Sequence, residues 1–361
     1  MDTVIKILIV EDTPVIRKYL EFIFESVPGM EVIGTAANGE EAIEFLKFRM
    51  PDVITMDIHM PKMDGFEATR YIMETTPLPI VIVSGSTDPS EVAVTFKAVE
   101  AGAVGITLRP PGIGHPNHET EAKKLVELVR LMSEVKVIRR RGGNGTALKS
   151  MPDGAVSNGA ADTGIIKNGI DIIAIGASTG GPPVIKSILE KLPAGYGAPV
   201  LVVQHIARGF TEGFAEWLNS SSKLSVCIAK HGEPALPGRV YVAPDDLHMG
   251  ISSDGILNMR GSDPEHGLRP SVSYLFRSVA ESFGPRAAGV ILTGMGSDGA
   301  DELLLMRQRG GITIAQDAES SVVHGMPGEA IKLNAAMHVL PPEMIAAAIG
   351  KLVTLNRRDL Q

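Results

Sequence analysis

Residues 4–12 read VIKILIVED, an apolar run that carries one charge and ends in two carboxylates. Val and Ile dominate the run, which predicts a buried β-strand. Working outward, similar runs recur at Val53–Met56 and Pro79–Val83, and apolar residues at helical spacing occupy Pro14–Ser26 and Glu40–Arg49 between them. Strands that alternate with helices of this length predict βαβ units and a parallel sheet.

The same alternation returns in the second half of the chain, after a last helical pattern at Glu119–Val137. The strand candidates there are Ile170–Ile175, Pro199–Val203, Arg239–Val242, Ala288–Leu292 and Gly311–Ala315. Between the halves, the sequence is rich in Gly, Ser, Asn and Ala without a sustained period, which is typical of a linker. We therefore predict two α/β domains, at 1–138 and 169–355, joined by a flexible linker at 139–168. The second is predicted to be a doubly wound fold with a mostly parallel sheet.

The composition excludes several classes of protein. Of the 361 residues, 44% are hydrophobic and 21% charged, which is ordinary for a globular chain and excludes a wholly disordered or fibrous one. The net charge of −8 argues against a nucleic acid partner. Cys227 is the only cysteine, so neither an intrachain disulfide nor a multi-cysteine zinc site is expected. No apolar run reaches the roughly 18 residues of a membrane span, and charged residues interrupt the N-terminal apolar stretch, so we expect a cytoplasmic protein without a signal peptide.

Acidic residues follow two of the first-half strands. Glu11 and Asp12 come directly after the first, and Asp57 ends another. Carboxyl ends of parallel strands meet at one edge of a sheet, where three carboxylates would repel one another unless a hard cation such as Mg²⁺ lay among them. Ser84 and Arg109 end two further strand patterns and could bind a phosphoryl group. Single acidic residues also cap such loops in many folds, so the set, rather than any one member, favours phosphoryl chemistry.

These residues lie in motifs that resemble the receiver domain of response regulators. The motifs are Val10-Glu11-Asp12, Met56-Asp57-Ile58-His59-Met60-Pro61-Lys62-Met63-Asp64-Gly65, Ser84 and Arg109-Pro110. The resemblance implies a flavodoxin-like fold, phosphorylation of Asp57 by a partner histidine kinase, and Mg²⁺ held by Glu11, Asp12 and Asp57. The family usually has Lys where Arg109 stands and often an aromatic residue where Ile106 stands. These departures leave open how strongly phosphorylation is coupled to a conformational switch.

The second half contains a candidate serine nucleophile. Gly176-Ala177-Ser178-Thr179-Gly180-Gly181 follows a strand and precedes a helical pattern, and it fits G-x-S-x-G. Taken alone, such a turn is more often a simple βα loop or an anion site. However, His205 and Asp298 also follow predicted parallel strands, so a nucleophile, a base and an orienting carboxylate can converge. The order Ser, His, Asp differs from that of α/β-hydrolases.

A second resemblance covers about 169–355. The motifs that carry it are Ile175-Gly176-Ala177-Ser178-Thr179-Gly180-Gly181, Val203-Gln204-His205, Arg269-Pro270-Ser271-Val272, Leu292-Thr293-Gly294-Met295-Gly296-Ser297-Asp298-Gly299-Ala300 and Gly325-Met326-Pro327. These motifs are similar to those of the catalytic domain of the CheB family, the chemotaxis protein-glutamate methylesterases that also deamidate glutamine. The resemblance implies Ser178 as nucleophile, His205 as base and Asp298 as orienting group, with no cofactor in this domain. Backbone N–H groups near Thr179 and Met295 are candidate oxyanion donors. Where the family often has prolines, this chain has Ala207-Arg208, and Arg208 could affect substrate docking or be a solvated loop residue.

The resemblance also implies partners and regulation. The substrate would be the methylated cytoplasmic domain of a chemoreceptor, the phosphodonor a chemotaxis histidine kinase, and the unphosphorylated receiver would limit access to the catalytic site. We expect a monomer. Two alternatives remain open: a non-catalytic binding module controlled by the receiver, and an esterase of the same mechanism in a non-chemotactic receptor pathway. The remaining second-half histidines fit no metal-ligand spacing and are expected in loops or on the surface; they are His231, His248, His266, His324 and His338.

Overall fold

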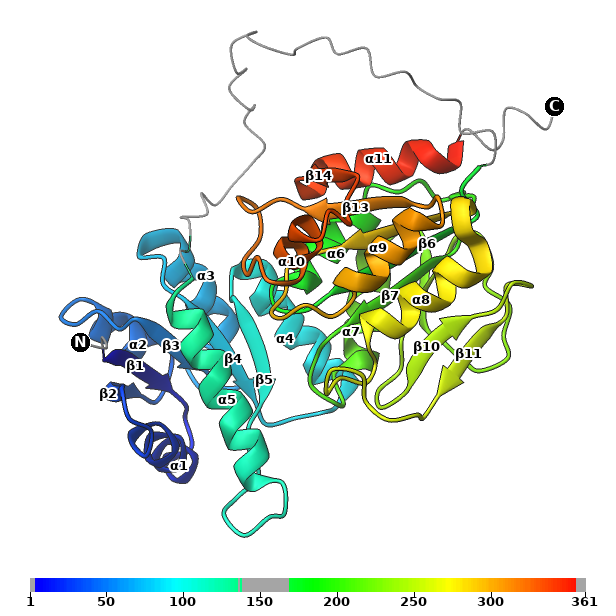
Figure 1. Cartoon of the computed structure of the whole chain (residues 1–361). Coiled ribbons are helices and arrows are strands. Elements are labelled where there is room, and N and C mark those ends of the chain that lie inside the picture. Colours follow the sequence, from blue (N-terminus) through cyan, green and yellow to red (C-terminus); the bar gives the residue numbers. More distant parts are fainter. Residues whose placement is uncertain (1–3, 136, 138–168, 355–361) are drawn as a thin grey trace, which may run out of the picture.

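The computed structural model describes residues 4–135, 137 and 169–354, which form two α/β lobes lying side by side (Figure 1). We name them the N-terminal lobe (4–135 and 137) and the C-terminal lobe (169–354). The predicted linker at 139–168 lies outside the described residues. Within the described ranges, no helix combines the length and apolar character needed to cross a membrane.

The N-terminal lobe has a parallel sheet of five strands in the order β2-β1-β3-β4-β5. Its elements are β1 (Ile5–Val10), α1 (Pro14–Glu25), β2 (Met30–Ala36), α2 (Gly39–Leu46), β3 (Val53–Met56), α3 (Gly65–Thr75), β4 (Ile80–Ser84), α4 (Pro89–Ala101), β5 (Gly105–Leu108) and α5 (His118–Ser133). Successive side chains of β1 point to opposite faces. Ile7 and Ile9 pack with α1 and α5, whereas Leu8 and Val10 pack with α2, α3 and α4. This is the predicted flavodoxin-like architecture.

The C-terminal lobe has a parallel sheet of seven strands in the order β14-β13-β12-β6-β7-β9-β8, and a separate antiparallel pair, β10-β11. Its elements are β6 (Ile172–Ala177), α6 (Gly181–Leu189), β7 (Val200–Gln204), α7 (Thr211–Ser221), β8 (Ser225–Ile228), β9 (Arg239–Val242), β10 (His248–Ile251), β11 (Leu257–Arg260), α8 (Val272–Phe283), the short 3₁₀ helix Gly284–Arg286, β12 (Ala287–Ile291), α9 (Ala300–Gln308), β13 (Ile312–Gln316), α10 (Met326–Lys332), β14 (His338–Leu340) and α11 (Pro342–Thr354).

Helices cover both faces of this second sheet, as predicted. Ile173 and Ile175 of β6 pack toward α6, α7 and α11, and Ile172 and Ala174 pack toward α8, α9 and α10. From β6 the chain continues to β7 on one side, and β12 lies on the other. The carboxyl ends of β6 and β12 therefore form a topological switch point, where open α/β sheets bind ligands.

One expectation about the histidines was wrong. His248 begins β10 and is fully buried, with its ring stacked on Tyr274 at 4.8 Å between centroids and Nε2 3.1 Å from the carbonyl oxygen of Asp263. A strand of only four residues with Gly in it gives little sequence signal, so this histidine was not recognised as a core residue.

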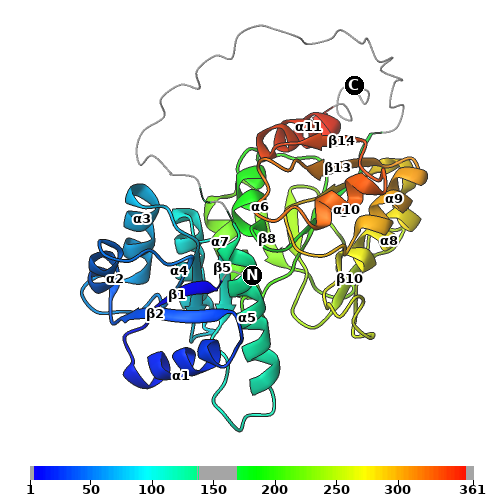
Figure 2. The same ribbon diagram turned by 60° about the vertical axis from the view of Figure 1, so that its left-hand side comes forward.

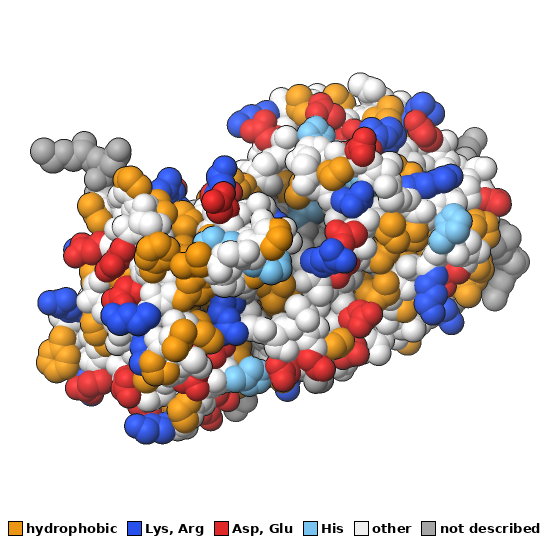
Figure 3. Space-filling view, turned by 90° about the horizontal axis from the view of Figure 1, so that it is seen from below, with side chains coloured by type: hydrophobic (Ala, Val, Ile, Leu, Met, Phe, Trp, Pro, Cys, Tyr) orange, Lys and Arg blue, Asp and Glu red, His pale blue; other side chains and the backbone are white. Residues whose placement is uncertain are grey.

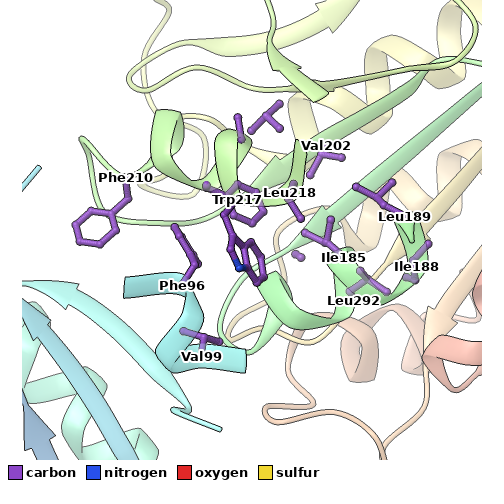
Figure 4. Close-up of a cluster of buried hydrophobic side chains, with 14 of the residues drawn as sticks. Phe96, Val99, Ile185, Ile188, Leu189, Val202, Phe210, Trp217, Leu218 and Leu292 are labelled. Carbon is purple, nitrogen blue, oxygen red and sulfur yellow. The ribbon is translucent and has the colours of Figure 1, made fainter. Parts of the chain in front are cut away.

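Helix α4 joins the two lobes (Figures 1, 2 and 4). Phe96 of α4 is almost fully buried, stacks on Trp217 of α7 at 5.1 Å and meets Phe210 edge-on at 6.4 Å. Lys186 of α6 forms an ion pair with Glu100 of α4 at 2.9 Å. One buried apolar cluster runs continuously from the N-terminal lobe through α4 into the C-terminal lobe. The two lobes therefore share a core rather than touching at a few surface side chains.

Candidate functional site

The turn between β6 and α6 holds Ser178. Ser178 N–H donates to the carbonyl of Thr293 at 3.0 Å, and Gly181 N–H donates to the carbonyl of Ser178 at 2.9 Å. Gly180 has a φ of 76°, in the left-handed region that Gly adopts without steric cost. The serine is thus held at a tight strand-to-helix turn at the switch point of the sheet, as its motif predicts.

His205 and Asp298 meet beside this turn. His205 N–H donates to the carbonyl of Ala177 at 2.9 Å, which fixes the histidine next to the serine loop. Its Nε2 lies 2.9 Å from Oδ2 of Asp298, with side chains 10% and 2% exposed. Since Nε2 is bound to the carboxylate, Nδ1 is the ring nitrogen left to exchange a proton. No hydrogen bond between the Ser178 hydroxyl and His205 is formed within the part of the chain that the structure describes.

Asp298 is held by the N-terminus of α8. Its carboxylate accepts hydrogen bonds from Ser271 Oγ at 2.9 Å, Val272 N at 2.7 Å and Ser273 N at 3.0 Å, besides the one from His205. Burial opposes ionisation, but the hydrogen bond and charge of His205, with the backbone N–H of Val272, outweigh it and keep the pKa of Asp298 below its ordinary value. The helix dipole also favours a negative charge at this position.

The sequence analysis assigned no role to two polar residues of this site. Ser271 caps α8 by accepting from Tyr274 N at 3.3 Å while it donates to Asp298. Gln204, the last residue of β7, donates to the carbonyls of Ser178 and His205. A serine just before a helical pattern is an N-cap signal and could have indicated Ser271; nothing in the sequence indicates the contacts of Gln204.

The two candidate oxyanion donors belong to the loop that carries Ser178 and to the loop that contacts it. Neither the Thr179 N–H nor the Met295 N–H donates to a protein acceptor among the described residues. Gly294, which precedes Met295, lies so close to Ser178 that a Cβ there would be 2.6 Å from the serine Cβ. The Met295 side chain is 59% exposed. Both N–H groups are therefore free to donate to a ligand beside the serine.

A pocket of about 80 Å³ lies in front of the serine, between the lobes. Ser178 and His205 line it from the C-terminal lobe, and Phe96, Ile106 and Leu128 line it from the N-terminal lobe. The surface is hollowed where the lobes meet, with histidine side chains beside the hollow (Figure 3). Arg208 is not a pocket residue here: it is 81% exposed and pairs with Asp246 at 3.0 Å.

The three predicted carboxylates of the N-terminal lobe also converge. Ligand atoms of Glu11, Asp12 and Asp57 all lie within 4.8 Å of one another, so the group could hold a metal ion. Burial and the nearby Asp57 raise the pKa of Glu11 to about 7. Burial likewise raises the pKa of Asp57. In both cases burial disfavours the ionised carboxylate, and a neighbouring carboxylate adds to the shift.

The two predicted phosphoryl-binding residues lie at the same edge of the sheet. Arg109 Nη1 is 3.8 Å from Oε2 of Glu11, and the guanidinium lies against Gly85, where a Cβ would be 2.5 Å from Nη2. Ser84 is buried, and its Oγ accepts from Ser86 N at 3.2 Å. The structure therefore places all five residues of the predicted acidic pocket around the carboxyl ends of β1, β3, β4 and β5.

Comparison with known proteins identifies relatives of both lobes. The family described as CheB methylesterase matches residues 173–349, and the response regulator receiver domain matches residues 7–112. A protein-glutamate methylesterase/protein-glutamine glutaminase of Nitrosospira multiformis is 54% identical over 97% of this chain and 97% of its own. One from Geobacter metallireducens is 53% identical over 96% and 99%. The catalytic domain of Thermotoga maritima CheB methylesterase is 39% identical, covers 51% of this chain and 99% of its own, and superposes with a TM-score of 0.50.

Proposed function

Because this chain belongs to the CheB methylesterase family, as a protein-glutamate methylesterase/protein-glutamine glutaminase with a receiver domain, we propose that Ser178, His205 and Asp298 carry out the hydrolysis. The observation that carries this proposal is the contact of His205 Nε2 with a buried Asp298 directly beside the Ser178 turn. A surface that merely bound an anion would have no need of a base held in one tautomer by a buried carboxylate.

The proposed first step forms an acyl-enzyme. Ser178 Oγ attacks the side-chain carbonyl of a receptor glutamate methyl ester, while His205 Nδ1 takes the hydroxyl proton. The negative charge that develops on the carbonyl oxygen is met by the N–H groups of Thr179 and Met295. His205 then gives its proton to the departing methoxide, and methanol leaves. Asp298 stays ionised throughout and stabilises the protonated imidazole.

The second step releases the receptor as a carboxylic acid. Water attacks the acyl group on Ser178, with His205 now acting as base toward the water and then returning the proton to the serine oxygen. With a glutamine side chain, ammonia leaves in the first step instead of methanol. Both reactions add a negative charge to the receptor.

We further propose domain limits of 1–138 and 169–355, a chemoreceptor cytoplasmic domain as substrate, a chemotaxis histidine kinase as phosphodonor, and the cytoplasm as the compartment. The activity for which the relatives are named supports the choice of substrate, and the match to the receiver domain supports the choice of phosphodonor. The expected absence of a nucleic acid partner, of a cofactor in the catalytic domain and of an oligomer remain predictions.

Regulation by the receiver is the second part of the proposal. The pocket in front of Ser178 is walled on one side by Phe96, Ile106 and Leu128 of the N-terminal lobe, so a protein substrate has to displace that lobe to reach the serine. The loop before α10 also spans the interface: Val322 and Val323 pack against the α1/α5 side of the receiver, and Val322 fills the space beside Gly180. We propose that phosphorylation of Asp57 loosens these contacts.

We expect a small-molecule phosphodonor with Mg²⁺ to raise methanol release from a methylated receptor fragment about tenfold or more in the wild type and not at all in Asp57→Asn. The reason is that the N-terminal lobe covers the pocket, and phosphorylation of Asp57 is proposed to shift the population toward molecules whose lobes have moved apart. Methanol release is measured by gas chromatography. If the phosphodonor stimulated methanol release by Asp57→Asn as much as by the wild type, phosphorylation of Asp57 would not be the cause of activation.

A substitution at the interface between the lobes tests the same gating. Phe96→Ala removes the ring that packs on Trp217 and Phe210, so we expect its release without phosphodonor to rise toward the stimulated wild-type rate. Phe48→Ala is the matched control, because Phe48 is 79% exposed and is not one of the aromatic side chains that pack α4 against α7 and Phe210. A Phe96→Ala enzyme that remains as slow as the unstimulated wild type would contradict gating by this interface.

The acidic cluster fits Mg²⁺. Its three carboxylates are the hard oxygen ligands this ion prefers. Burial raises the pKa of Glu11 and of Asp57, and a cation among the carboxylates would favour their ionised forms. We propose that Glu11, Asp12 and Asp57 hold it. When bound, the ion would neutralise charge on the transferred phosphoryl group. Ser84 would donate to a phosphoryl oxygen and Arg109 would supply the second cation.

The pKa of Glu11 gives Mg²⁺ binding a pH dependence. Below about pH 7 the Glu11 carboxyl is protonated and must lose its proton to bind the ion, whereas above that pH it is already ionised. We expect the apparent Mg²⁺ affinity to rise about tenfold between about pH 6 and about pH 8, with proton release at the lower pH. Isothermal titration calorimetry in two buffers of different ionisation enthalpy measures both. Glu11→Gln should bind more weakly with a flatter pH dependence, and an unchanged slope would contradict this assignment.

A further inference from the structure

Gln204 links the nucleophile loop to the base. Its side chain is 7% exposed, and Nε2 donates to the carbonyl of Ser178 at 2.8 Å and to the carbonyl of His205 at 2.9 Å. Both partners are carbonyl oxygens, which can only accept, so the amide nitrogen must be the atom facing them. The two hydrogens of this nitrogen are thus used on the main chains of the two residues that exchange a proton in the reaction.

The carbonyl of Ser178 shares a peptide group with the N–H of Thr179. A peptide group is planar, so its N–H points opposite to its C=O. Two donors hold this carbonyl, Gln204 Nε2 at 2.8 Å and Gly181 N at 2.9 Å, and together they fix the plane of the group. The direction of the Thr179 N–H, which has no protein acceptor among the described residues, is fixed by the same two bonds.

The oxygen end of the Gln204 amide, Oε1, is buried and is left by this orientation without a hydrogen-bond partner in the described part of the chain. It lies against Gly181, where a Cβ would be only 2.2 Å from Oε1. Buried acceptors are seldom left unpaired, and those that are call for an explanation. Here the unpaired oxygen is the consequence of committing the nitrogen to the carbonyls of Ser178 and His205.

We infer that Gln204 is a positioning residue for the ester hydrolysis: through the Ser178–Thr179 peptide group it aims the Thr179 N–H at the oxyanion. The same amide also holds the main chain of His205. It thereby fixes the position of the base relative to the nucleophile, although the side chains of His205 and Ser178 form no hydrogen bond here. Gln204 does not touch the reacting atoms. This inference rests on the proposed hydrolase function and goes beyond it in assigning a group outside the Ser178, His205 and Asp298 set.

The test compares Gln204→Met, which keeps the shape without a donor, with Gln204→Glu, which places an acceptor opposite two carbonyls. The matched control is Thr313→Val. Thr313 is a fully buried residue of β13 whose Oγ1 donates to the Ala335 carbonyl and accepts from Met337 N, away from Ser178. Methanol release from a methylated receptor fragment and hydrolysis of p-nitrophenyl acetate are both measured with phosphodonor and Mg²⁺ present, together with the melting temperature.

We expect Gln204→Met to lower kcat about 10²-fold, as loss of one aimed oxyanion donor does, and Gln204→Glu to lower it further. For Gln204→Met, KM should stay within about threefold and the acidic limb of the pH–rate profile should not move, because the substitution adds no charge beside His205 and leaves its hydrogen bond to Asp298 in place. The carboxylate of Gln204→Glu lies beside His205 and should move that limb to higher pH. Thr313→Val should lower the melting temperature comparably and leave kcat within about twofold. A Gln204→Met kcat within threefold of wild type, or an equal loss of kcat in Thr313→Val, would overturn the inference.

The two substrates separate this inference from the proposed function. If the wild type cleaves p-nitrophenyl acetate but no receptor ester, the proposed substrate is wrong, and the Gln204 variants are scored on the acetate alone. If the wild type cleaves neither, Ser178 is not an active nucleophile, and both the proposed function and the role of Gln204 are overturned.

Discussion

Ser178→Ala is expected to reduce methanol release from a methylated receptor fragment by more than about 10⁴-fold, because the acyl-enzyme cannot form without the serine oxygen. The residual rate would come only from the oxyanion donors and from binding. The substitution removes one oxygen from a half-buried side chain that makes no hydrogen bond among the described residues, so the melting temperature should hardly change. Steady-state methanol release with phosphodonor and Mg²⁺ present is the measurement.

The control for this variant is Ser187→Ala. Ser187 lies in α6, the helix that follows the nucleophile turn, and its Oγ donates to the Val184 carbonyl at 2.9 Å. The chemical change is the same, and we expect a rate within about twofold of wild type. Phosphorylation of Asp57 should be normal in both variants, since the receiver is untouched. A Ser178→Ala enzyme that keeps even a hundredth of the wild-type rate would exclude Ser178 as nucleophile and favour the binding-module alternative.

Most strands could be predicted because a parallel strand covered on both faces is an uninterrupted apolar run. The runs at Val53–Met56 and Arg239–Val242 coincide with β3 and β9. The strands that the sequence does not predict lie at the edges of the two large sheets or in the separate β10-β11 pair. β2 carries Glu31 and Gly34 within its seven residues, and β14 has only three residues, two of them exposed. Such strands depend on their neighbours for stability, and their sequences carry little evidence of them.

The location of the candidate site followed from the same logic. Ser178, His205 and Asp298 each follow a parallel strand, and the carboxyl ends of β6, β7 and β12 lie side by side in the sheet order. The contacts made by the side chains of the site could not be predicted from the sequence. Neither the choice of Nε2 for Asp298 nor the covering of the pocket by Phe96 leaves a local pattern, since both depend on residues about a hundred positions apart in the chain.

Asp298→Asn is expected to lower kcat about 10³- to 10⁴-fold. Both oxygens of the carboxylate are occupied by donors. Oδ1 accepts from Ser271 Oγ and Ser273 N, and Oδ2 accepts from Val272 N and His205 Nε2. An asparagine has one oxygen only, so whichever way the amide turns, its NH₂ group opposes two donors. Either the hydrogen bond that holds His205 in its tautomer is lost, or the α8 N-terminus loses two bonds.

Two further variants decide whether the loss is catalytic or structural. Asp301→Asn makes the same change on an exposed residue of the first turn of α9 and should leave kcat within about twofold. Ser271→Ala removes one of the four bonds to Asp298 and keeps the one from His205, so it should lower the melting temperature but reduce kcat only about tenfold or less. If Ser271→Ala instead lost as much kcat as Asp298→Asn, the carboxylate would act by supporting α8 rather than by orienting His205.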